Sequence, residues 1–298
     1  MSKIGIVIDP HITDRHRCRC DNFLDVALKK LDYVATQNDY VIICGDLFHT
    51  NTNSHLIFNK VYKLFTKHKG KFFAIPGNHD LLHNNISMLE KTTIGSLFLT
   101  GALHLEFDKF KIDGVEFQVS HVIKDMDKVP VDDTNSKVLI GHNYMEPVGT
   151  EKEWFTKDEI RKLNYKLVFL GHDHQPHEEE YLGNSVLIRM GSLTRIDTQP
   201  YNKERGIFYY RLDTKDMSYT KEEVPHEDAQ KIFTVEAFQR IGRKKEDITF
   251  IQIGNVLSKF KKRDNVNNSL HSKLSKIATD REIEYIKALH DLNNVRYF

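Results

Sequence analysis

Five short apolar segments of the sequence each end in residues that can bind a metal ion. The residues that follow them are, in chain order, Asp9 and His11, Asp46, Asn78, His142, and His172 and His174. A glycine directly precedes the first ligand in four of the five segments, the exception being Asp9. Glycine permits a sharp turn and a close approach of the backbone. The pattern therefore predicts five loops at strand ends, each presenting one or two ligands.

The types of these residues indicate which metal they would hold. Two aspartates, one asparagine and four histidines are more ligands than one tetrahedral zinc ion takes, and no thiolate cluster accompanies them. Seven such ligands fit two divalent ions that share a carboxylate. Two ions about 3.5–4 Å apart can clamp the attacking and leaving oxygens of a phosphate ester. Manganese is the first expectation, with iron or zinc as alternatives, because mixed oxygen and imidazole ligands suit these ions better than magnesium or calcium.

The elements between these residues indicate how they are positioned. Expected strands of the first half are the apolar runs at 4–8, 40–44 and 72–75. Expected helices have apolar residues at helical spacing, at 23–34 and 56–65. This alternation is typical of βαβ units, in which the carboxyl ends of parallel strands form the crevice of the site. From about residue 103 strands without helices predict a second, mixed or antiparallel sheet, so we expect a layered α/β sandwich.

The motifs Asp-x-His, Gly-Asp, Gly-Asn-His-Asp, Gly-His and Gly-His-x-His, in this order, resemble those of the calcineurin-like metallophosphoesterase superfamily over residues 9–174. The resemblance implies a four-layer sandwich of two mixed β-sheets flanked by helices. It also implies two ligand sets that share Asp46, namely Asp9, His11, Asp46 and His174 for one metal, and Asp46, Asn78, His142 and His172 for the other. His79 would then face the leaving group, and Asp80 would orient it. His49 would contact the substrate phosphate or the transition state, unless it caps a helix or supports the site from behind.

Four further segments are similar to those of SbcD-type DNA double-strand-break repair nucleases. They are Gly45-Asp46-Leu47-Phe48-His49, Gly171 to Pro176, Gly191-Ser192-Leu193-Thr194-Arg195 and Glu204-Arg205-Gly206-Ile207. This resemblance implies a DNA exonuclease or endonuclease that uses a metal-activated hydroxide, with DNA, an SbcC-type ATPase subunit and a second copy of the chain as expected partners. The compact, Asn- and Lys-rich sequence would fit a phage-encoded member. The alternatives are a small-substrate phosphodiesterase or phosphatase on the same fold, and a binding subunit that lost catalysis.

The composition limits the other classes of protein. The chain has 298 residues, 40% of them hydrophobic, and a formal net charge of +1. These values exclude a mainly disordered chain. No apolar run reaches the roughly 18–20 residues that span a bilayer, so no membrane association is expected. Three cysteines are too few for a disulfide framework in a chain of this length, and we expect a cytoplasmic protein, in the host cytoplasm if it is phage-encoded.

A change in composition near residue 224 predicts a domain boundary. We expect a catalytic domain at 1–223 and a small C-terminal α+β region at 224–298 that caps the site or binds DNA or a partner. Its expected strands are 231–235 and 248–253, followed by two helical stretches. Eight basic residues face only two acidic ones between Arg240 and Arg263. The expected phosphate contacts are Arg243, Lys244, Lys245, Lys261, Lys262 and Arg263, together with Arg15, Arg17 and Arg19 after the first motif.

Overall fold

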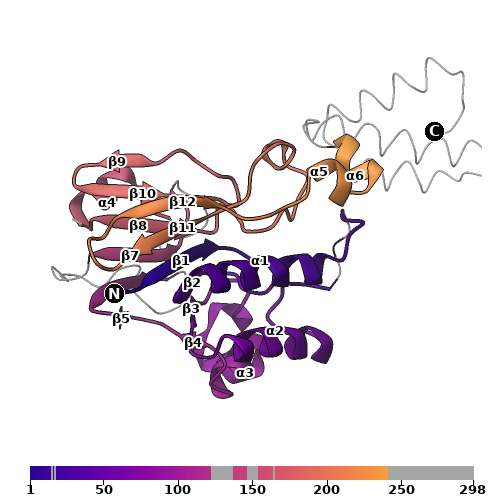
Figure 1. Cartoon of the computed structure of the whole chain (residues 1–298), viewed down its shortest axis with the longest axis horizontal. Helices are drawn as coiled ribbons and strands as arrows, with labels where there is room; N and C mark the ends of the chain where they lie inside the picture. The colour runs from indigo at the N-terminus through magenta and orange to yellow at the C-terminus, as the bar shows by residue number, and fades with distance from the viewer. Residues whose placement is uncertain (15, 17, 122–136, 146–153, 164, 241–298) are drawn as a thin grey trace, which may run out of the picture. The chain divides into compact units, whose positions relative to one another are not determined.

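Two mixed β-sheets of six strands each form the centre of the computed structural model, which describes residues 1–14, 16, 18–121, 137–145, 154–163 and 165–240 (Figure 1). The first sheet has the order β12-β11-β1-β2-β3-β4, with bounds Tyr219–Glu223, Phe208–Asp213, Lys3–Ile8, Tyr40–Cys44, Phe72–Ile75 and His104–Leu105. The second has the order β5-β6-β7-β8-β10-β9, with bounds Lys109–Ile112, Val115–Ser120, Val138–His142, Leu167–Gly171, Ser185–Ile188 and Glu180–Leu182.

The helices of the described part lie outside the two sheets. The α-helices are α1 (Phe23–Gln37), α2 (His55–Lys67), α3 (Thr93–Leu99), α4 (Lys157–Leu163), α5 (Ala229–Ile232) and α6 (Val235–Arg240). Short 3₁₀ turns are η1 (Leu82–Asn84), η2 (Ile86–Lys91) and η4 (Pro200–Asn202). In Figure 1, α1, α2 and α3 cover the outer side of the first sheet, and α4 lies beside the second.

The alternation of side chains along β1 shows how the layers form. Ile4, Ile6 and Ile8 belong to an apolar core that also contains residues of the second sheet, so they fill the space between the sheets. Val7 points the other way and packs in a core with Leu31 of α1. A third core joins the second sheet to α4. The order is helix, sheet, sheet, helix, which confirms the predicted four-layer sandwich.

The direction of the strands brings the predicted motifs together. β1, β2 and β3 are parallel neighbours, and so are β7 and β8 in the second sheet. All five motifs therefore begin at the carboxyl ends of strands. β2 also lies close to β7 and β8, so the two sets of strand ends face a common space.

Three predictions about the elements after residue 103 are wrong. Strand β4 pairs with β3 and β11 pairs with β1, so both belong to the first sheet rather than the second. A helix, α4, interrupts the expected run of strands. It begins at a capping box, in which Thr156 and Glu159 each accept a hydrogen bond from the backbone N–H of the other.

The third error concerns residues 231–235, which form parts of α5 and α6 instead of a strand. Ala229, Ile232, Phe233 and Ala237 follow a helical spacing and form a small core with Cys18. Thr234 separates the two helices, since its hydroxyl accepts a hydrogen bond from the N–H of Ala237. The boundary at 223 stays a prediction. The strand expected at 248–253 and the helical stretches after it lie outside the described residues.

No helix in the described part of the chain has the length and apolar character needed to cross a bilayer.

Candidate metal centre

The seven predicted ligands lie together where the five strands end. Two groups of three offer ligand atoms within 4.8 Å of one another: Asp9, His11 and His174, and Asp46, His142 and His172. Asn78 joins the second group, because its Oδ1 lies 3.1 Å from Nε2 of His142. The two groups correspond to the two ligand sets implied by the sequence resemblance.

Asp46 lies between the two groups. Its Oδ2 is 3.4 Å from Nε2 of His11 and 3.3 Å from Nε2 of His142. This oxygen is buried and has no hydrogen-bond partner in the described part of the chain. The other oxygen, Oδ1, accepts a hydrogen bond of 2.8 Å from the backbone N–H of His79. A buried carboxylate oxygen left without a donor is costly, and a cation on either side would satisfy it.

Asp9 is arranged in a similar way. Its Oδ2 accepts a hydrogen bond of 2.8 Å from the backbone N–H of His172. Its Oδ1 is buried without a hydrogen-bond partner among the described residues and lies 3.2 Å from Nδ1 of His142. The donor set thus combines two orphaned carboxylate oxygens, imidazole nitrogens and one amide oxygen. These residues fit two divalent ions of the manganese, iron or zinc type.

The titration of the histidines agrees with a metal-binding role. Burial lowers the pKa of His11 well below its ordinary value and that of His172 to about 3, so both are neutral and keep a lone pair for a cation. Burial also opposes the charged form of His142, but Asp46 and Asp9 outweigh it and raise its pKa well above the ordinary value. A divalent ion takes the place of such a proton between a histidine and its carboxylates.

The glycines before the ligands are required by close packing. A Cβ on Gly45 would lie 1.9 Å from Nδ1 of His142, and one on Gly77 would lie 2.1 Å from Oδ1 of Asp46. A Cβ on Gly171 would approach the backbone oxygen of Cys44 to 2.4 Å. The predicted close approach of the backbone therefore occurs at these positions. Several ligands also have the left-handed backbone that non-glycine residues rarely adopt, with φ of 48° at Asp9 and His11, 42° at Asp46 and 83° at His172.

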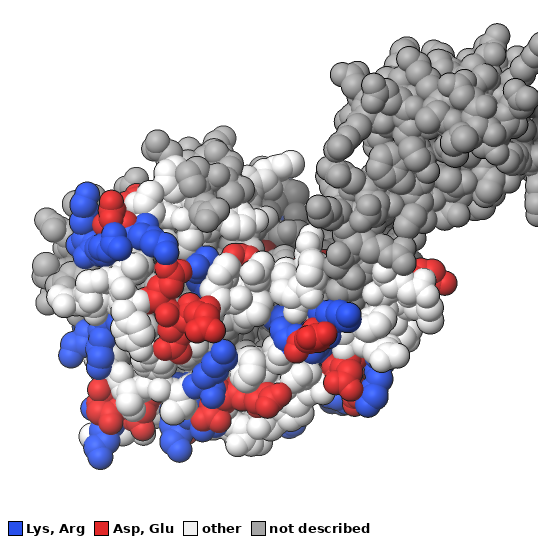
Figure 2. Space-filling model, turned by 90° about the horizontal axis from the view of Figure 1, so that it is seen from above, with Lys and Arg blue, Asp and Glu red and all other residues white. Residues whose placement is uncertain are grey.

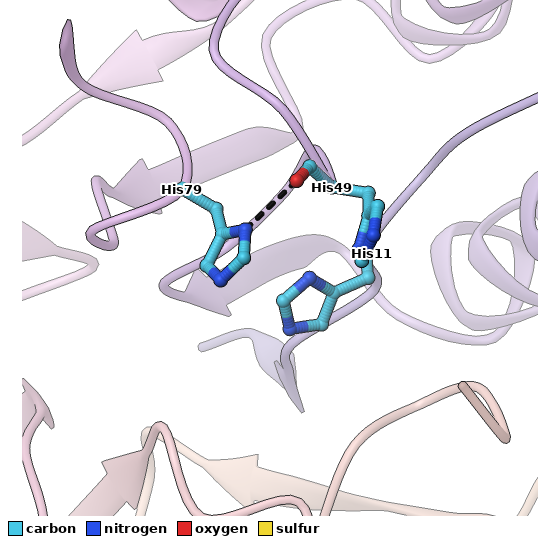
Figure 3. Close-up of side chains that lie close together, drawn as sticks. All are labelled: His11, His49 and His79. Atoms are coloured by element: carbon cyan, nitrogen blue, oxygen red, sulfur yellow. Dashed lines mark hydrogen bonds between the residues drawn. The ribbon is translucent and has the colours of Figure 1, made fainter. Parts of the chain in front are cut away.

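His79 and His49 lie beside the first ligand group (Figure 3). Nδ1 of His79 donates a hydrogen bond of 2.7 Å to the backbone oxygen of His49, and the two rings are stacked at 5.6 Å. The ring of His11 lies 5.0 Å from that of His79 and 5.6 Å from that of His49. Because the bond to a carbonyl places the proton on Nδ1, the Nε2 atom of neutral His79 carries the lone pair.

The prediction that Asp80 orients His79 is wrong. Asp80 is fully buried, and its carboxylate accepts hydrogen bonds from the backbone N–H groups of Leu47, Phe48 and Gly77. The backbone carbonyl of His49, rather than the carboxylate of Asp80, accepts the hydrogen bond from Nδ1 of His79. Burial, together with the charge of Asp46, raises the pKa of Asp80 to about 7. Asp80 therefore joins the loop after β2 to the loop after β3.

The residues of this site lie within the match to a known protein family. The sequence profile of the family described as "Calcineurin-like phosphoesterase" matches residues 9–176, more than half of the chain. The chain belongs to the calcineurin-like phosphoesterase family. Members of this family typically bind two divalent metals, as the two ligand groups here would. No curated protein sequence matches this phosphoesterase significantly.

Three solved structures are similar to parts of this phosphoesterase. TT1561 of Thermus thermophilus is 14% identical over 75% of this chain and 99% of its own, with a TM-score of 0.44. An archaeal phosphodiesterase is 15% identical over 74% and 99% of the two chains, with a TM-score of 0.40. A hypothetical protein from Thermus thermophilus is 14% identical over 75% and 100%, with a TM-score of 0.43.

Three residues near the centre of the phosphoesterase were missed in the sequence. The ring of Tyr144 lies 3.9 Å from that of His172, and the carboxylate of Asp197 lies 3.9 Å from Nδ1 of His174. The ring of His16 lies 6.1 Å from the ring of His49. Tyr144 could have been noticed because it follows Gly141-His142 by two residues. No local signal marks Asp197.

The basic residues predicted to contact DNA are mostly outside the described part of the phosphoesterase. This applies to Arg15, Arg17, Arg243, Lys244, Lys245, Lys261, Lys262 and Arg263. Arg19 is described, and its predicted contact with phosphates is wrong: it is buried and donates to Asp21 and to the backbone oxygen of Arg195. Figure 2 shows basic and acidic side chains interspersed over the described surface of one face.

Proposed function

We propose that this phosphoesterase hydrolyses phosphodiester bonds of DNA with two divalent metal ions, as a nuclease similar to the SbcD type. The position of Asp46 Oδ2, between His11 and His142 and without a hydrogen-bond donor among the described residues, carries the proposal. Asp46 and the two ligand groups would hold the ions, and the chemistry supplied by bound ions would be activation of a water molecule and neutralisation of the charge of the scissile phosphate. Manganese is our choice of metal.

His79 is suited to assist the departure of the sugar oxygen. Its backbone N–H is fixed by Asp46 and its Nδ1 by the His49 carbonyl, so the ring cannot rotate without losing a hydrogen bond. In the protonated form, Nε2 would donate a proton to the leaving oxygen. A positioned general acid of this kind contributes roughly 100- to 10,000-fold to a rate. His49, stacked on His79, would contact a neighbouring phosphate oxygen.

The preference for DNA rests on the resemblance to SbcD-type nucleases, and the contacts of the resembling segments support it. Two of these segments are far from the first motif in the sequence; one of them is hydrogen-bonded to it, and the other is hydrogen-bonded to the first of these two. Arg205 donates to the backbone oxygens of Ser192 and Thr194, and the hydroxyl of Thr194 donates to the backbone oxygen of Pro10. The similar segments thus form one connected unit around the ligands, as expected if they serve one substrate.

A substrate panel tests this function. Metal-free protein is loaded with Mn²⁺ and assayed on end-labelled single- and double-stranded DNA, on a chromogenic phosphodiester and on a chromogenic phosphomonoester. We expect cleavage of DNA, and His79→Ala should keep both ions while losing most of the turnover. Turnover of the chromogenic phosphodiester without any DNA cleavage would contradict the nuclease assignment and favour a small-substrate phosphodiesterase. Full DNA cleavage by His79→Ala would contradict the role of that residue.

The partners are proposed on the sequence alone. We propose that the residues from Arg243 to Arg263 contact the DNA backbone, and that the nuclease acts with an SbcC-type ATPase and as a homodimer. Each phosphate contact contributes about −0.9 to the slope of log K against log salt. A variant with Arg243→Gln, Lys244→Gln and Lys245→Gln should therefore bind duplex DNA with a slope reduced by about 2–3. An unchanged slope in a fluorescence anisotropy titration would remove these residues from the interface.

A further inference from the structure

A segment of six residues after β10, Ser192–Asp197, lies against the backbone of the first motif. The N–H of Leu193 donates a hydrogen bond of 2.8 Å to the backbone oxygen of Ile8, the last residue of β1. The hydroxyl of Thr194, which is fully buried, donates one of 2.9 Å to the backbone oxygen of Pro10. Pro10 is the residue between the ligands Asp9 and His11, both of which have a left-handed backbone.

The same segment also contacts the third member of that ligand group. The N–H of Ser192 donates a hydrogen bond of 3.2 Å to the backbone oxygen of His174. A carboxylate oxygen of Asp197 lies 3.9 Å from Nδ1 of His174. On the other side of this ring, Nε2 lies 2.9 Å from Nε2 of His11. The ring is thus oriented with Nδ1 toward Asp197 and Nε2 toward the position that His11 faces.

Buried basic side chains hold the backbone carbonyls of this segment. Four consecutive backbone oxygens each accept a hydrogen bond from a buried basic side chain: those of Ser192 and Thr194 from Arg205, that of Leu193 from Lys30, and that of Arg195 from Arg19. Bonds with charged donors are stronger than those between neutral groups. With its carbonyls held in this way, the segment presents the N–H groups of Ser192 and Leu193 and the hydroxyl of Thr194 to the first motif and to His174.

The second ligand group is held by different elements. Asp46 is bonded to the backbone of His79 in the loop after β3. His142 lies with Nδ1 at 3.4 Å from the backbone oxygen of Cys44 in β2 and with Nε2 at 3.1 Å from Oδ1 of Asn78. The two groups meet at Asp9, whose Oδ2 accepts a hydrogen bond from the N–H of His172, but Asp46 and His142 are held by parts of the fold other than Ser192–Asp197.

We propose that Thr194 and Asp197 are positioning residues for one of the two metal sites, the one formed by Asp9, His11 and His174. Thr194 holds the peptide between two of the ligands by a hydrogen bond, and the charge of Asp197 orients the ring of the third. The inference rests on the proposed two-metal function. It adds that the affinities of the two ions can be changed separately, because among the described residues Ser192–Asp197 contacts the peptide of Pro10 and His174 but neither Asp46 nor His142.

Calorimetric titration of the metal-free full chain with Mn²⁺ tests the proposal, with elemental analysis of the ions retained after dialysis. Thr194→Val keeps the shape of the side chain and removes its donor. Loss of a group that supports a ligand typically costs about 10- to 100-fold in metal affinity. We expect that loss for one ion and an unchanged affinity for the other. Thr194→Ser, which keeps the hydroxyl, should bind both ions as the wild type does.

Thr66→Val is the matched control. Its hydroxyl donates a similar bond, 2.8 Å, to the backbone oxygen of Tyr62, but on the exposed side of α2. This variant should bind both ions normally. If Thr194→Val binds both ions with wild-type affinity, or loses both to the same extent, the proposal is overturned.

Asp197→Asn keeps the proposal falsifiable if Thr194→Val does not fold. The Asp197 side chain is 34% exposed, and asparagine keeps an oxygen that can accept the hydrogen bonds that Gln199 and Asn202 donate to Asp197. This variant should weaken one ion only, and unchanged binding of both ions would overturn the role of Asp197. Wild-type protein that binds fewer than two ions would instead overturn the proposed two-metal function and the inference with it.

Discussion

Replacement of Gly45 by alanine should separate the packing of the metal centre from the stability of the fold. Gly45 precedes Asp46 and has a φ of 80°. A Cβ at this position would lie 1.9 Å from Nδ1 of His142 and 2.4 Å from its Cγ. His142 is buried with 0% exposure, so its ring has no solvent to move into.

The size of the effect follows from these distances. Carbon and nitrogen atoms pack at about 3.4 Å or more, so the imidazole must move by about 1.5 Å. A misplacement of about 1 Å costs a catalytic site on the order of 100-fold in rate. We therefore expect Gly45→Ala to lose at least about 100-fold in phosphodiester turnover and most of its affinity for the ion held by His142. The left-handed backbone costs a further 1–2 kcal/mol or so in stability, whatever the packing.

Gly70→Ala is the matched control for the backbone cost. Its φ is 77°, and a Cβ added there meets nothing within 4 Å. The assays are Mn²⁺ content, turnover of a chromogenic phosphodiester and thermal unfolding. In Gly70→Ala, Tm should fall by about 2–4 °C for each kcal/mol of stability that the left-handed backbone costs. This variant should keep its bound metals and its activity. Wild-type turnover and metal content in Gly45→Ala would refute the reasoning, and so would an equal loss of activity in both variants.

Two further predictions concern charge. Asp46→Asn should weaken both ions together, because Oδ2 lies at similar distances from a ligand of each group. Binding at 100 times Kd stabilises a protein by about 2.7 kcal/mol, so the rise in Tm on adding Mn²⁺ should be much smaller in this variant than in the wild type. Burial, followed by the charges of Arg19 and two other arginines, lowers the pKa of Lys30 well below 10.5. The unfolded chain then binds the extra proton between the two pKa values, so stability should increase with pH up to about 10.5, and the increase should be smaller in Lys30→Met. The free energy of unfolding is measured with urea at several pH values. If it changes with pH to the same extent in the wild type and in Lys30→Met, this prediction is wrong.

The convergence of the candidate ligands could be predicted because their signal is local. An apolar run, a glycine and a polar residue at a strand end form a pattern within a few residues, as in Val41 to Asp46. The direction of parallel strands then brings such ends together. The helix at 23–34 was predicted for a similar reason, since its apolar spacing matches the face that packs on β1 and β2.

The errors concern relations between distant residues or short ambiguous runs. Asp80 follows His79 directly, but its carboxylate bonds to three backbone N–H groups, two of them more than thirty residues away. Strand β11 joins β1 across two hundred residues, which no local pattern specifies. The run from Ile232 to Val235 is apolar enough for a strand, and only Thr234 as a helix cap indicates otherwise.

The antiparallel pairing of β11 with β1 has a consequence for how the chain acquires its metal centre. All seven candidate ligands precede residue 175, but β1 becomes a central strand only when Ile6 pairs with Tyr210. Until Leu193 has left the ribosome, Lys30 also lacks the carbonyl to which it donates, and the carbonyls on either side of Leu193 wait for Arg205. During synthesis the ligands should therefore stay unassembled until about 213 residues are available. A fragment that ends at residue 176, where the family match ends, should bind no Mn²⁺ in the calorimeter, whereas one that ends at 240 should bind two ions.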